Sequence, residues 1–271
     1  MADYYLDARG NGQIFNVEEE ICKDNSVWQS IEISKLELLG KVLVLDGIIQ
    51  LSELDKDRYH ETITHPVVQT AVKTPNCAAE VLILGGGDGI IAGEVLRYPG
   101  VGVTLVDIDD RVIELCKKHL SDMNNSSLSS PWVRVKTEDA LQFVARAKAK
   151  SYDAIFLDIT DPHPESPSRS LLGKDAILSY KSLLTPGGII VCQTDNPMVT
   201  PQHKEQVRRT FSSTFHNVGE FGITALTFSG LFSFVWASDY HKELLFNENV
   251  VRTRWLSSDR FEMCKKILDL A

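Results

Sequence analysis

A glycine-rich loop that contains one carboxylate follows a short apolar strand. The run Val-Leu-Ile-Leu-Gly-Gly-Gly-Asp-Gly-Ile starts at Val81, and its carboxylate is Asp88. Such loops usually bind nucleotide phosphates through backbone N–H groups, and Gly87, Gly89 and Ala92 even have the dinucleotide spacing G-x-G-x-x-A. An aspartate would repel a pyrophosphate, because two like unit charges about 4 Å apart cost roughly 4 kcal/mol at an effective dielectric constant of about 20. The same carboxylate attracts a sulfonium or an amine, so the loop predicts a cationic ligand such as S-adenosylmethionine or a relative.

Acidic side chains follow the later predicted strands as well. In an open α/β sheet, ligands bind beyond the carboxyl ends of the strands, so residues at those positions are the candidates for a site. After the first strand and its Asp88, the acidic residues at these positions are Asp107, Glu138, Asp139, Asp158 and Asp161. Carboxylates gathered at one crevice repel one another and raise at least one pKa, a cost that is reasonable where cations fill the site.

Each of these acids also has a simpler interpretation. Asp107 follows the glycine loop by about 20 residues, where an acid accepts hydrogen bonds from ribose hydroxyls, or it is a solvated residue at a strand end. Glu138 and Asp139 contact an adenine amino group, or they cap the following helix. Asp158 and Asp161 are delivered to the ligand edge by an apolar strand, or they belong to an Asp-Pro turn that ends it.

The elements that must position these side chains alternate regularly. From residue 81 apolar runs alternate with helical stretches, which is typical of a doubly wound α/β sheet. The predicted strands cover 81–84, 102–107, 132–136, 153–158, 187–193, 218–226 and 231–238. The predicted helices cover 59–73, 89–97, 110–120, 138–149, 170–183 and 201–214, and Pro186-Gly187-Gly188 is predicted to form a turn. Short alternating runs at 28–33, 41–45 and 48–51 predict a small antiparallel sheet before them.

Composition limits the class of protein. A chain of 271 residues with 43% apolar and 24% charged residues fits one large domain and a small one. The net charge of −9 disfavours nucleic acid or an anionic membrane as the partner. The five cysteines are scattered and never in C-x-x-C spacing, which indicates reduced thiols and no metal site. With no leader-like start and no long apolar run, the sequence predicts a soluble cytoplasmic protein.

Several short motifs follow one another along the chain: Trp28-Gln29, Leu43–Gln50, Tyr59-His60-Glu61, Gly85–Gly89, Asp158–Pro162 and Gln193–Pro197. Taken together and in this order, they resemble the spermidine synthase family, the polyamine aminopropyltransferases. The resemblance implies an α/β fold, with a Rossmann-like doubly wound sheet of the methyltransferase type in residues 59–271. It also implies a small N-terminal antiparallel β domain in residues 1–58 and assembly into a homodimer or homotetramer.

The resemblance also implies an activity and a set of site residues. The co-substrate is decarboxylated S-adenosylmethionine, whose aminopropyl group passes to a polyamine, and methylthioadenosine is released. Asp158 is the implied base, Tyr59 joins its network, and Asp88 and Asp161 hold amino groups. Further positions implied to contact the co-substrate are Gln29, His60, Gly85, Gly87, Asp107, Ile108, Glu138 and Asp139. Positions implied to line the acceptor pocket are Tyr59, Asp88, Asp161, Gln193 and Thr227, although Gln193 is equally well explained as a hydrogen-bonded residue at a strand end.

The chemistry explains why a base is needed. A primary amine with a pKa near 10.4 is almost fully protonated at pH 7, and freeing its lone pair costs about 4 to 5 kcal/mol. A carboxylate within reach removes the proton as the nitrogen attacks the carbon beside the sulfonium. This chemistry requires no metal and no covalent intermediate.

Some segments depart from the common spermidine synthase pattern. The stretch after Asp161-Pro162 is longer, and Ala225–Gly230 replaces a segment whose tyrosine lines the diamine pocket. These departures, together with Asp107-Ile-Asp109 and His65-Pro66, resemble thermospermine synthases. The loop aspartate Asp88 and the run from Gln193 resemble bacterial spermidine synthases instead. The acceptor is therefore left open between putrescine and spermidine.

Three rival functions remain at this point. An amine N-methyltransferase would use S-adenosylmethionine itself, but the carboxylate of that donor would meet repulsion from Asp88. A catalytically silent polyamine-binding paralogue fits the altered pocket, but the aspartates of the motif are all present. An NAD-dependent oxidoreductase is disfavoured by Asp88 and by the lack of a recognisable partner for hydride transfer.

Overall fold

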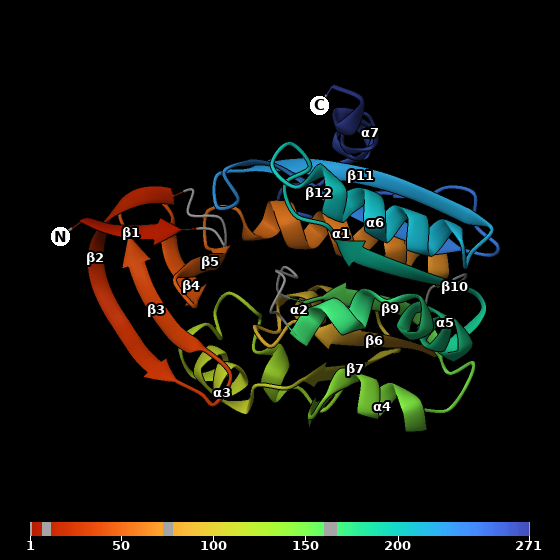
Figure 1. Ribbon diagram of the computed structural model, residues 1–271, viewed down its shortest axis with the longest axis horizontal. Coiled ribbons are helices and arrows are strands. Elements are labelled where there is room, and N and C mark those ends of the chain that lie inside the picture. Colours follow the sequence, from red (N-terminus) through yellow and green to blue (C-terminus); the bar gives the residue numbers. More distant parts are fainter. Residues whose placement is uncertain (1, 7–11, 73–77, 160–166, 271) are drawn as a thin grey trace.

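The computed structural model describes residues 2–6, 12–72, 78–159 and 167–270 of the chain. Two sheets stand side by side, a small one formed by the N-terminal segment and a larger one covered by helices (Figure 1). The predicted α/β class, with a Rossmann-like sheet and a small N-terminal β unit, is confirmed. In the described part of the chain, no helix is long and apolar enough to cross a membrane.

The N-terminal sheet is an antiparallel meander. Its strands follow one another in the order β1 to β5: β1 (Ala2–Leu6), β2 (Gly12–Asn25), β3 (Ser30–Leu36), β4 (Gly40–Leu45) and β5 (Ile48–Ser52). The last three lie where the sequence predicts them, and Asp46-Gly47 forms the tight turn between β4 and β5, with both residues at positive φ. Strands β1 and β2 were not predicted, because β2 is rich in exposed charged residues and lacks a regular apolar alternation.

The larger sheet has seven strands in the order β11-β12-β10-β9-β6-β7-β8. Their bounds are β6 (Ala79–Gly85), β7 (Val101–Asp107), β8 (Val133–Thr137), β9 (Tyr152–Asp158), β10 (Leu184–Gln193), β11 (Asn217–Ala225) and β12 (Gly230–Ser238). Strands β6 to β10 run parallel, whereas β12 pairs antiparallel with both β10 and β11. The chain moves outward from β6 to β8 and then returns to β9 on the other side of β6, so the switch point of the topology lies between β6 and β9.

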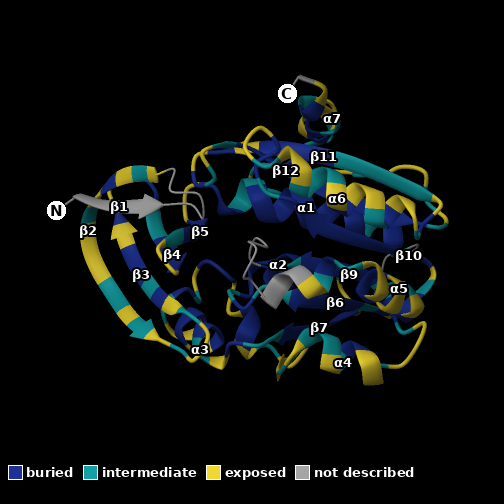
Figure 2. Ribbon diagram, viewed as in Figure 1, coloured by how far each residue is buried: buried dark blue, intermediate teal, exposed yellow. Residues whose placement is uncertain are grey.

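The helices divide between the two faces of this sheet. They are α1 (Lys56–Ala71), α2 (Ile90–Val95), α3 (Asp110–His119), α4 (Ala140–Arg146), α5 (Lys174–Leu183), α6 (Pro201–Ser212) and α7 (Ser258–Lys266), with 3-10 turns at Ser127–Ser129, Pro167–Leu172 and Ile267–Leu270. Alternate residues of β6 explain the division: Val81 and Ile83 pack in the core of α1, α2, α3 and α7, and Leu82 and Leu84 pack in the core of α4, α5 and α6. Helix α1 and the central strands are therefore buried almost throughout (Figure 2).

The structure differs from the prediction in two details. Pro186-Gly187-Gly188 lies inside β10 rather than in a turn before it, and the pairing with β9 shifts register between Leu184 and Ile189. A bulge there explains the positive φ of Gly187 without ending the strand. Helix α7 was not predicted, because it is short and buries Phe261 and Cys264 as its main apolar contacts.

Candidate functional site

The glycine loop lies at the switch point between β6 and β9. Gly85, the last residue of β6, pairs with Asp158, the last residue of β9, and the Gly86 N–H donates to the Asp158 carbonyl oxygen at 2.9 Å. The loop closes with the Gly89 N–H donating to the Gly86 carbonyl at 2.9 Å, immediately before α2. The first strand thus brings its loop into direct contact with the strand that carries the predicted base.

Glycine is required in this loop by close approach and by backbone conformation. At Gly85 φ is +82°, and a Cβ atom would lie 2.2 Å from the Asp158 carbonyl oxygen. At Gly87 a Cβ atom would lie 2.8 Å from Oδ2 of Asp107. The loop therefore touches the ends of both neighbouring strands, and any larger side chain would displace the backbone of Asp158 at Gly85 or the carboxylate of Asp107 at Gly87.

Asp158 is the acid whose surroundings are most altered. The hydroxyl of Tyr59, on α1, donates to Oδ1 of Asp158 at 2.8 Å. Desolvation of the carboxyl group raises the pKa of Asp158 to about 7, the nearby charges of Asp88 and Asp107 act in the same direction, and the Tyr59 hydrogen bond opposes them. Repulsion between clustered carboxylates therefore adds to the larger effect of burial, and the resulting pKa suits a base that works near neutral pH.

Tyr59 is held in place by a group of aromatic rings. Its ring centroid lies 5.1 Å from that of Phe234 and 5.6 Å from those of Phe228 and Phe232. Phe228 and Phe232 also pack on each other, with centroids 4.3 Å apart. Tyr59 is 6% exposed, so packing fixes the ring and leaves the hydroxyl directed at Asp158.

His60 lies beside Tyr59 and is buried. Its Nδ1 is 2.7 Å from the Lys56 carbonyl, which acts as an acceptor and therefore requires the proton on Nδ1. Burial lowers the pKa of His60, with the charge of Asp88 opposing this shift. The imidazole is thus neutral at pH 7, and its Nε2 is an acceptor.

Asp107 organises the loop from the end of β7. Its carboxylate accepts hydrogen bonds from the N–H groups of Gly87 and Asp109, both at 2.9 Å. Burial raises the pKa of Asp107 to about 6, although these two backbone donors act in the opposite direction. Ile108, the next residue, is half-buried. The carboxylate lies where the sequence predicts it, next to the glycine loop.

Gln29 reaches the large sheet from the N-terminal one. Its side-chain amide donates to Oδ2 of Asp109 at 2.8 Å, and the Ser26 hydroxyl donates to the same oxygen at 2.7 Å. Asp109 is fully buried and caps α3, accepting from the N–H groups of Arg111 and Val112. Sequence reasoning missed Asp109, although an aspartate directly before a predicted helix is a recognisable N-cap signal.

Glu138 and Asp139 have partners within the protein. Asp139 is exposed and caps α4, accepting from the Gln142 N–H at 2.9 Å. Glu138 is half-buried and forms an ion pair with Arg146. The structure therefore contains the capping interaction for Asp139, and a contact of either acid with adenine stays a prediction.

Gln193 and Thr227, which are predicted to line the acceptor pocket, both form hydrogen bonds within the protein. Gln193 is buried, donates to the Ile159 carbonyl at 2.7 Å and accepts from the Asp195 N–H at 3.0 Å. The Thr227 hydroxyl lies 2.6 Å from that of Ser52 and donates to Asp55 at 3.1 Å. These two side chains hold the loops around the site, and their contact with a substrate stays a prediction. Asp161 lies outside the described residues.

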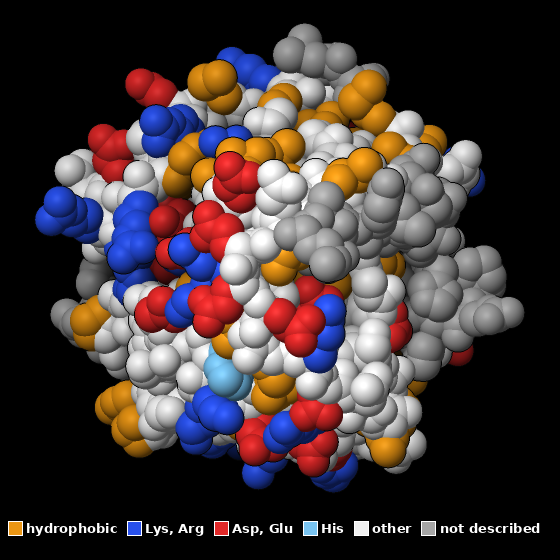
Figure 3. Space-filling view, turned by 90° about the vertical axis from the view of Figure 1, so that its left-hand side faces the viewer, with side chains coloured by type: hydrophobic (Ala, Val, Ile, Leu, Met, Phe, Trp, Pro, Cys, Tyr) orange, Lys and Arg blue, Asp and Glu red, His pale blue; other side chains and the backbone are white. Residues whose placement is uncertain are grey.

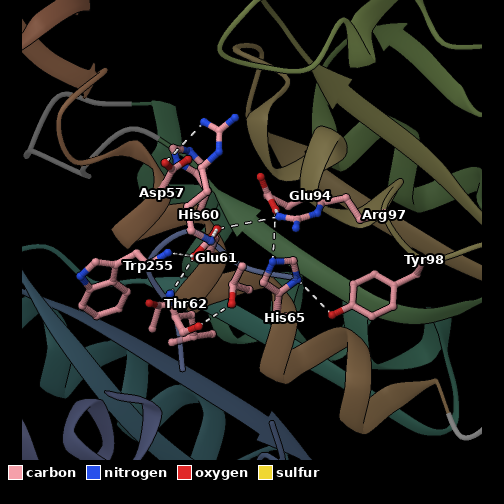
Figure 4. Close-up of polar contacts among 12 residues, drawn as sticks. Asp57, His60, Glu61, Thr62, His65, Glu94, Arg97, Tyr98 and Trp255 are labelled. Atoms are coloured by element: carbon pink, nitrogen blue, oxygen red, sulfur yellow. Dashed lines mark hydrogen bonds and ion pairs between the residues drawn. The ribbon is translucent and has the colours of Figure 1, made fainter. Parts of the chain in front are cut away.

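A second charged cluster lies behind the site, between α1 and α2 (Figure 4). It contains Glu61, His65 and Glu94, all buried, whose potential ligand atoms lie within 4.8 Å of one another. The guanidinium of Arg97 lies 2.6 Å from Glu94 and 3.8 Å from Glu61, so an internal cation already balances these acids. His65 Nε2 and Arg97 together lower the pKa of Glu94 to about 2, against the effect of its burial.

Comparison with known proteins identifies the family to which this fold and site belong. Residues 56–248 match the family model of the spermine/spermidine synthase domain, and residues 4–53 match that of the spermidine synthase tetramerisation domain. Polyamine aminopropyltransferase 2 of Hyperthermus butylicus is 37% identical over 213 residues, which cover 78% of this chain and 68% of that protein. The polyamine aminopropyltransferase of Sulfolobus acidocaldarius is 34% identical over 240 residues, 88% of this chain and 78% of its own.

The solved structures agree with the sequence matches. A spermidine synthase in complex with the transition state analogue AdoDATO superposes with a TM-score of 0.82 at 26% identity, covering 100% of this chain and 96% of that one. The spermidine synthase from Thermotoga maritima has the same fold, with a TM-score of 0.81 at 24% identity, 100% of this chain and 95% of its own being covered. The chain therefore belongs to the spermine/spermidine synthase family, the polyamine aminopropyltransferases.

Proposed function

We propose that this protein transfers the aminopropyl group of decarboxylated S-adenosylmethionine to a polyamine and releases methylthioadenosine. The observation that carries the proposal is the group formed by Tyr59, Asp158 and the glycine loop with Asp88 at the switch point of the sheet. The loop provides negative charge where a nucleotide-binding loop usually accepts phosphate, which suits a sulfonium and an amine. The family membership and the structural likeness to a spermidine synthase that binds AdoDATO support the same conclusion.

In the proposed reaction Asp158 takes a proton from the acceptor amine. The freed nitrogen lone pair forms a bond to the carbon beside the sulfonium, and the electrons of the breaking C–S bond neutralise the sulfur. Asp88 and Asp161 hold the amino groups, Tyr59 keeps the base oriented, and neutral His60 lies beside the co-substrate. Asp107 and Gln29 position its nucleoside, together with Gly85, Gly87, Ile108, Glu138 and Asp139.

The position of Thr227 bears on the choice of acceptor. Its hydroxyl is directed at Ser52 and Asp55, and Phe228 packs against Tyr59 in the neighbouring position. The wall beside the base is therefore aromatic and apolar, which favours the methylene chain of an extended amine. We propose that spermidine is accepted beside putrescine.

A product assay tests the activity and its alternatives. Decarboxylated S-adenosylmethionine and S-adenosylmethionine are offered in turn with putrescine and spermidine, and the products are identified by mass spectrometry. We expect methylthioadenosine and an aminopropylated amine with the decarboxylated donor. Methylation with release of S-adenosylhomocysteine would support the N-methyltransferase instead, and no product from folded protein would support the silent paralogue.

The pH dependence of the free enzyme follows from the pKa of Asp158. A base acts when deprotonated, so kcat/KM should be full above the pKa of about 7 and fall below it. Tyr59→Phe removes the hydrogen bond that lowers this pKa, so its acid limb should move to higher pH. The measurement is kcat/KM from pH 5 to 9, with Tyr152→Phe, at the far end of β9, as the control. An unmoved acid limb in Tyr59→Phe would show that the hydroxyl does not tune the base.

Assembly is proposed to involve the N-terminal sheet. Residues 4–53 match a tetramerisation domain, and we propose a homodimer or homotetramer with residues 1–58 as the assembly unit and 59–271 as the catalytic unit. On the side of the molecule that this sheet occupies, basic and acidic side chains are interspersed (Figure 3). Ion pairs such as Lys35–Glu18 at 2.8 Å and Lys23–Glu20 at 2.7 Å belong to this sheet.

A further inference from the structure

A buried carboxylate ties the helix of the site to the C-terminal part of the chain. Glu61 is fully buried, and its two oxygens accept the backbone N–H groups of Arg254 at 2.6 Å and of Trp255 and Leu256 at 2.8 Å (Figure 4). A buried charge is costly unless hydrogen bonds replace its hydration, and three donors to one carboxylate do so. These hydrogen bonds thus form a specific, buried contact, unlike a surface ion pair.

The same C-terminal segment is held from a second residue of α1. The Arg58 guanidinium lies 5.3 Å from the centroid of the Trp255 ring, and it also donates to the Thr224 carbonyl at 2.6 Å. Arg260 lies against the same ring at 5.5 Å. Trp255 is therefore fixed through its backbone N–H by Glu61 and through its ring by the two guanidinium groups. The contacts of Glu61 and Arg58 with residues 254–256 are called the clasp.

The two tethered residues flank the site residues in sequence. Arg58 precedes Tyr59 and Glu61 follows His60, so contacts on either side of this pair meet at Trp255. Because successive residues of a helix are about 100° apart, fixing residues 58 and 61 fixes the rotation of the first turns of α1. That rotation sets the direction of the Tyr59 hydroxyl toward Asp158, 2.8 Å away.

We infer that Glu61 is a positioning residue, through which the segment 254–256 holds α1 in the rotation that directs Tyr59 at Asp158. The inference rests on the proposed function, and it extends the site to a segment beyond the matched family domain, which ends at residue 248. Among the described residues, no hydrogen bond of Glu61 reaches Tyr59 or Asp158, so its effect passes along the helix backbone.

The test uses two variants of the clasp in the full chain. Glu61→Gln keeps the shape but turns an amide donor toward backbone donors, and Trp255→Ala removes the ring that Arg58 covers. Both should lower kcat by about tenfold or more, because a displacement of about 1 Å in a reacting group can cost about a hundredfold. KM for the donor should change less than about threefold, and the acid limb of kcat/KM should move upward as the Tyr59 hydrogen bond weakens.

Matched controls separate this effect from general loosening. Glu248→Gln alters a carboxylate that also accepts a backbone N–H in the C-terminal part, from Ser258 at 2.9 Å, and no hydrogen bond of this carboxylate reaches α1 among the described residues. Arg254→Ala removes an exposed side chain and its surface ion pair with Asp57 of α1 at 3.7 Å, which contributes little energy, but it keeps the N–H that donates to Glu61. Both should retain the kcat and pH profile of the unaltered protein.

A second readout does not depend on turnover. Hydrogen exchange of the α1 peptide should accelerate in Glu61→Gln and Trp255→Ala but not in the controls. If Glu61→Gln cannot be purified folded, Glu61→Asp, which keeps the charge but shortens the reach to the three N–H groups, takes its place. Folded variants with unaltered kcat, pH profile and α1 exchange would overturn the inference. If the unaltered protein made no aminopropylated product while α1 exchange responded as expected, the proposed function would fail and the clasp would stand as a structural contact only.

Discussion

Replacing Asp158 with asparagine is expected to lower kcat by about a thousandfold, because a positioned general base contributes about 10² to 10⁴ in rate. Asparagine keeps the shape of the side chain and still accepts the hydrogen bond that Tyr59 donates at 2.8 Å. It cannot take the proton from the acceptor amine. Binding of methylthioadenosine, measured by calorimetry, should stay within a few-fold of the unaltered protein, so the loss appears in kcat.

Asp153→Asn provides the matched control, because it makes the same change on the same strand. Asp153 lies near the start of β9, accepts from the Glu80 N–H at 3.0 Å and from the Thr185 hydroxyl at 2.8 Å, and is remote from the strand end that forms the site. Turnover should therefore be retained in this variant. Folded Asp158→Asn with unaltered turnover would show that the base is another group.

The same substitution also has an expected effect on stability. The pKa of Asp158 is raised in the folded protein from 3.8 to about 7, so the folded state binds the proton more tightly than the unfolded state. The free energy of unfolding must then decrease as the pH rises between these two values. Asparagine removes this dependence, and the melting temperature of Asp158→Asn relative to the unaltered protein should accordingly be higher at pH 8 than at pH 5.

Gly85→Ala is expected to destabilise the protein by about 3 kcal/mol or more. A non-glycine residue at positive φ costs about 1–2 kcal/mol, and overpacking adds about 1–3 kcal/mol. Here the added Cβ would meet the backbone oxygen of Asp158 at 2.2 Å, where no flexible side chain can move aside. Because the clash displaces the residue that carries the base, kcat should fall together with the melting temperature.

Gly47→Ala separates the two contributions. Gly47 has a similar φ, +78° against +82°, but a Cβ there meets nothing within 4 Å. This variant should lose about 1–2 kcal/mol from backbone strain alone and keep its turnover. Thermal unfolding of both variants is the measurement, with about 2–4 °C expected per kcal/mol in a protein of this size class. Equal losses in the two variants would show that the approach to Asp158 is not as close as described.

Much of the fold could be predicted from the sequence because its signals are local. The apolar runs of β6, β7 and β9 are bounded by glycine or acidic residues, and their alternation with helical stretches predicts parallel pairing whatever the detailed packing. The strand β2 and the helix α7 escaped prediction because few of their residues are buried in a regular period. The strand β2 depends on pairing with the strands β1 and β3, and α7 depends on packing against β11.

The candidate site, like the fold, has parts that the sequence predicts and parts that it does not. Asp88, Asp107 and Asp158 can be placed at or just beyond strand ends, and so at one edge of the sheet, from the sequence alone, since strand ends are set by local pattern and topology by a general rule. The folded chain is needed to show that Tyr59 donates to Asp158, that Gln29 reaches Asp109 and that Glu61 holds the segment 254–256. These contacts join residues about 80 to 195 positions apart, and their geometry depends on register, helix rotation and side-chain packing, none of which leaves a periodic signal in the chain.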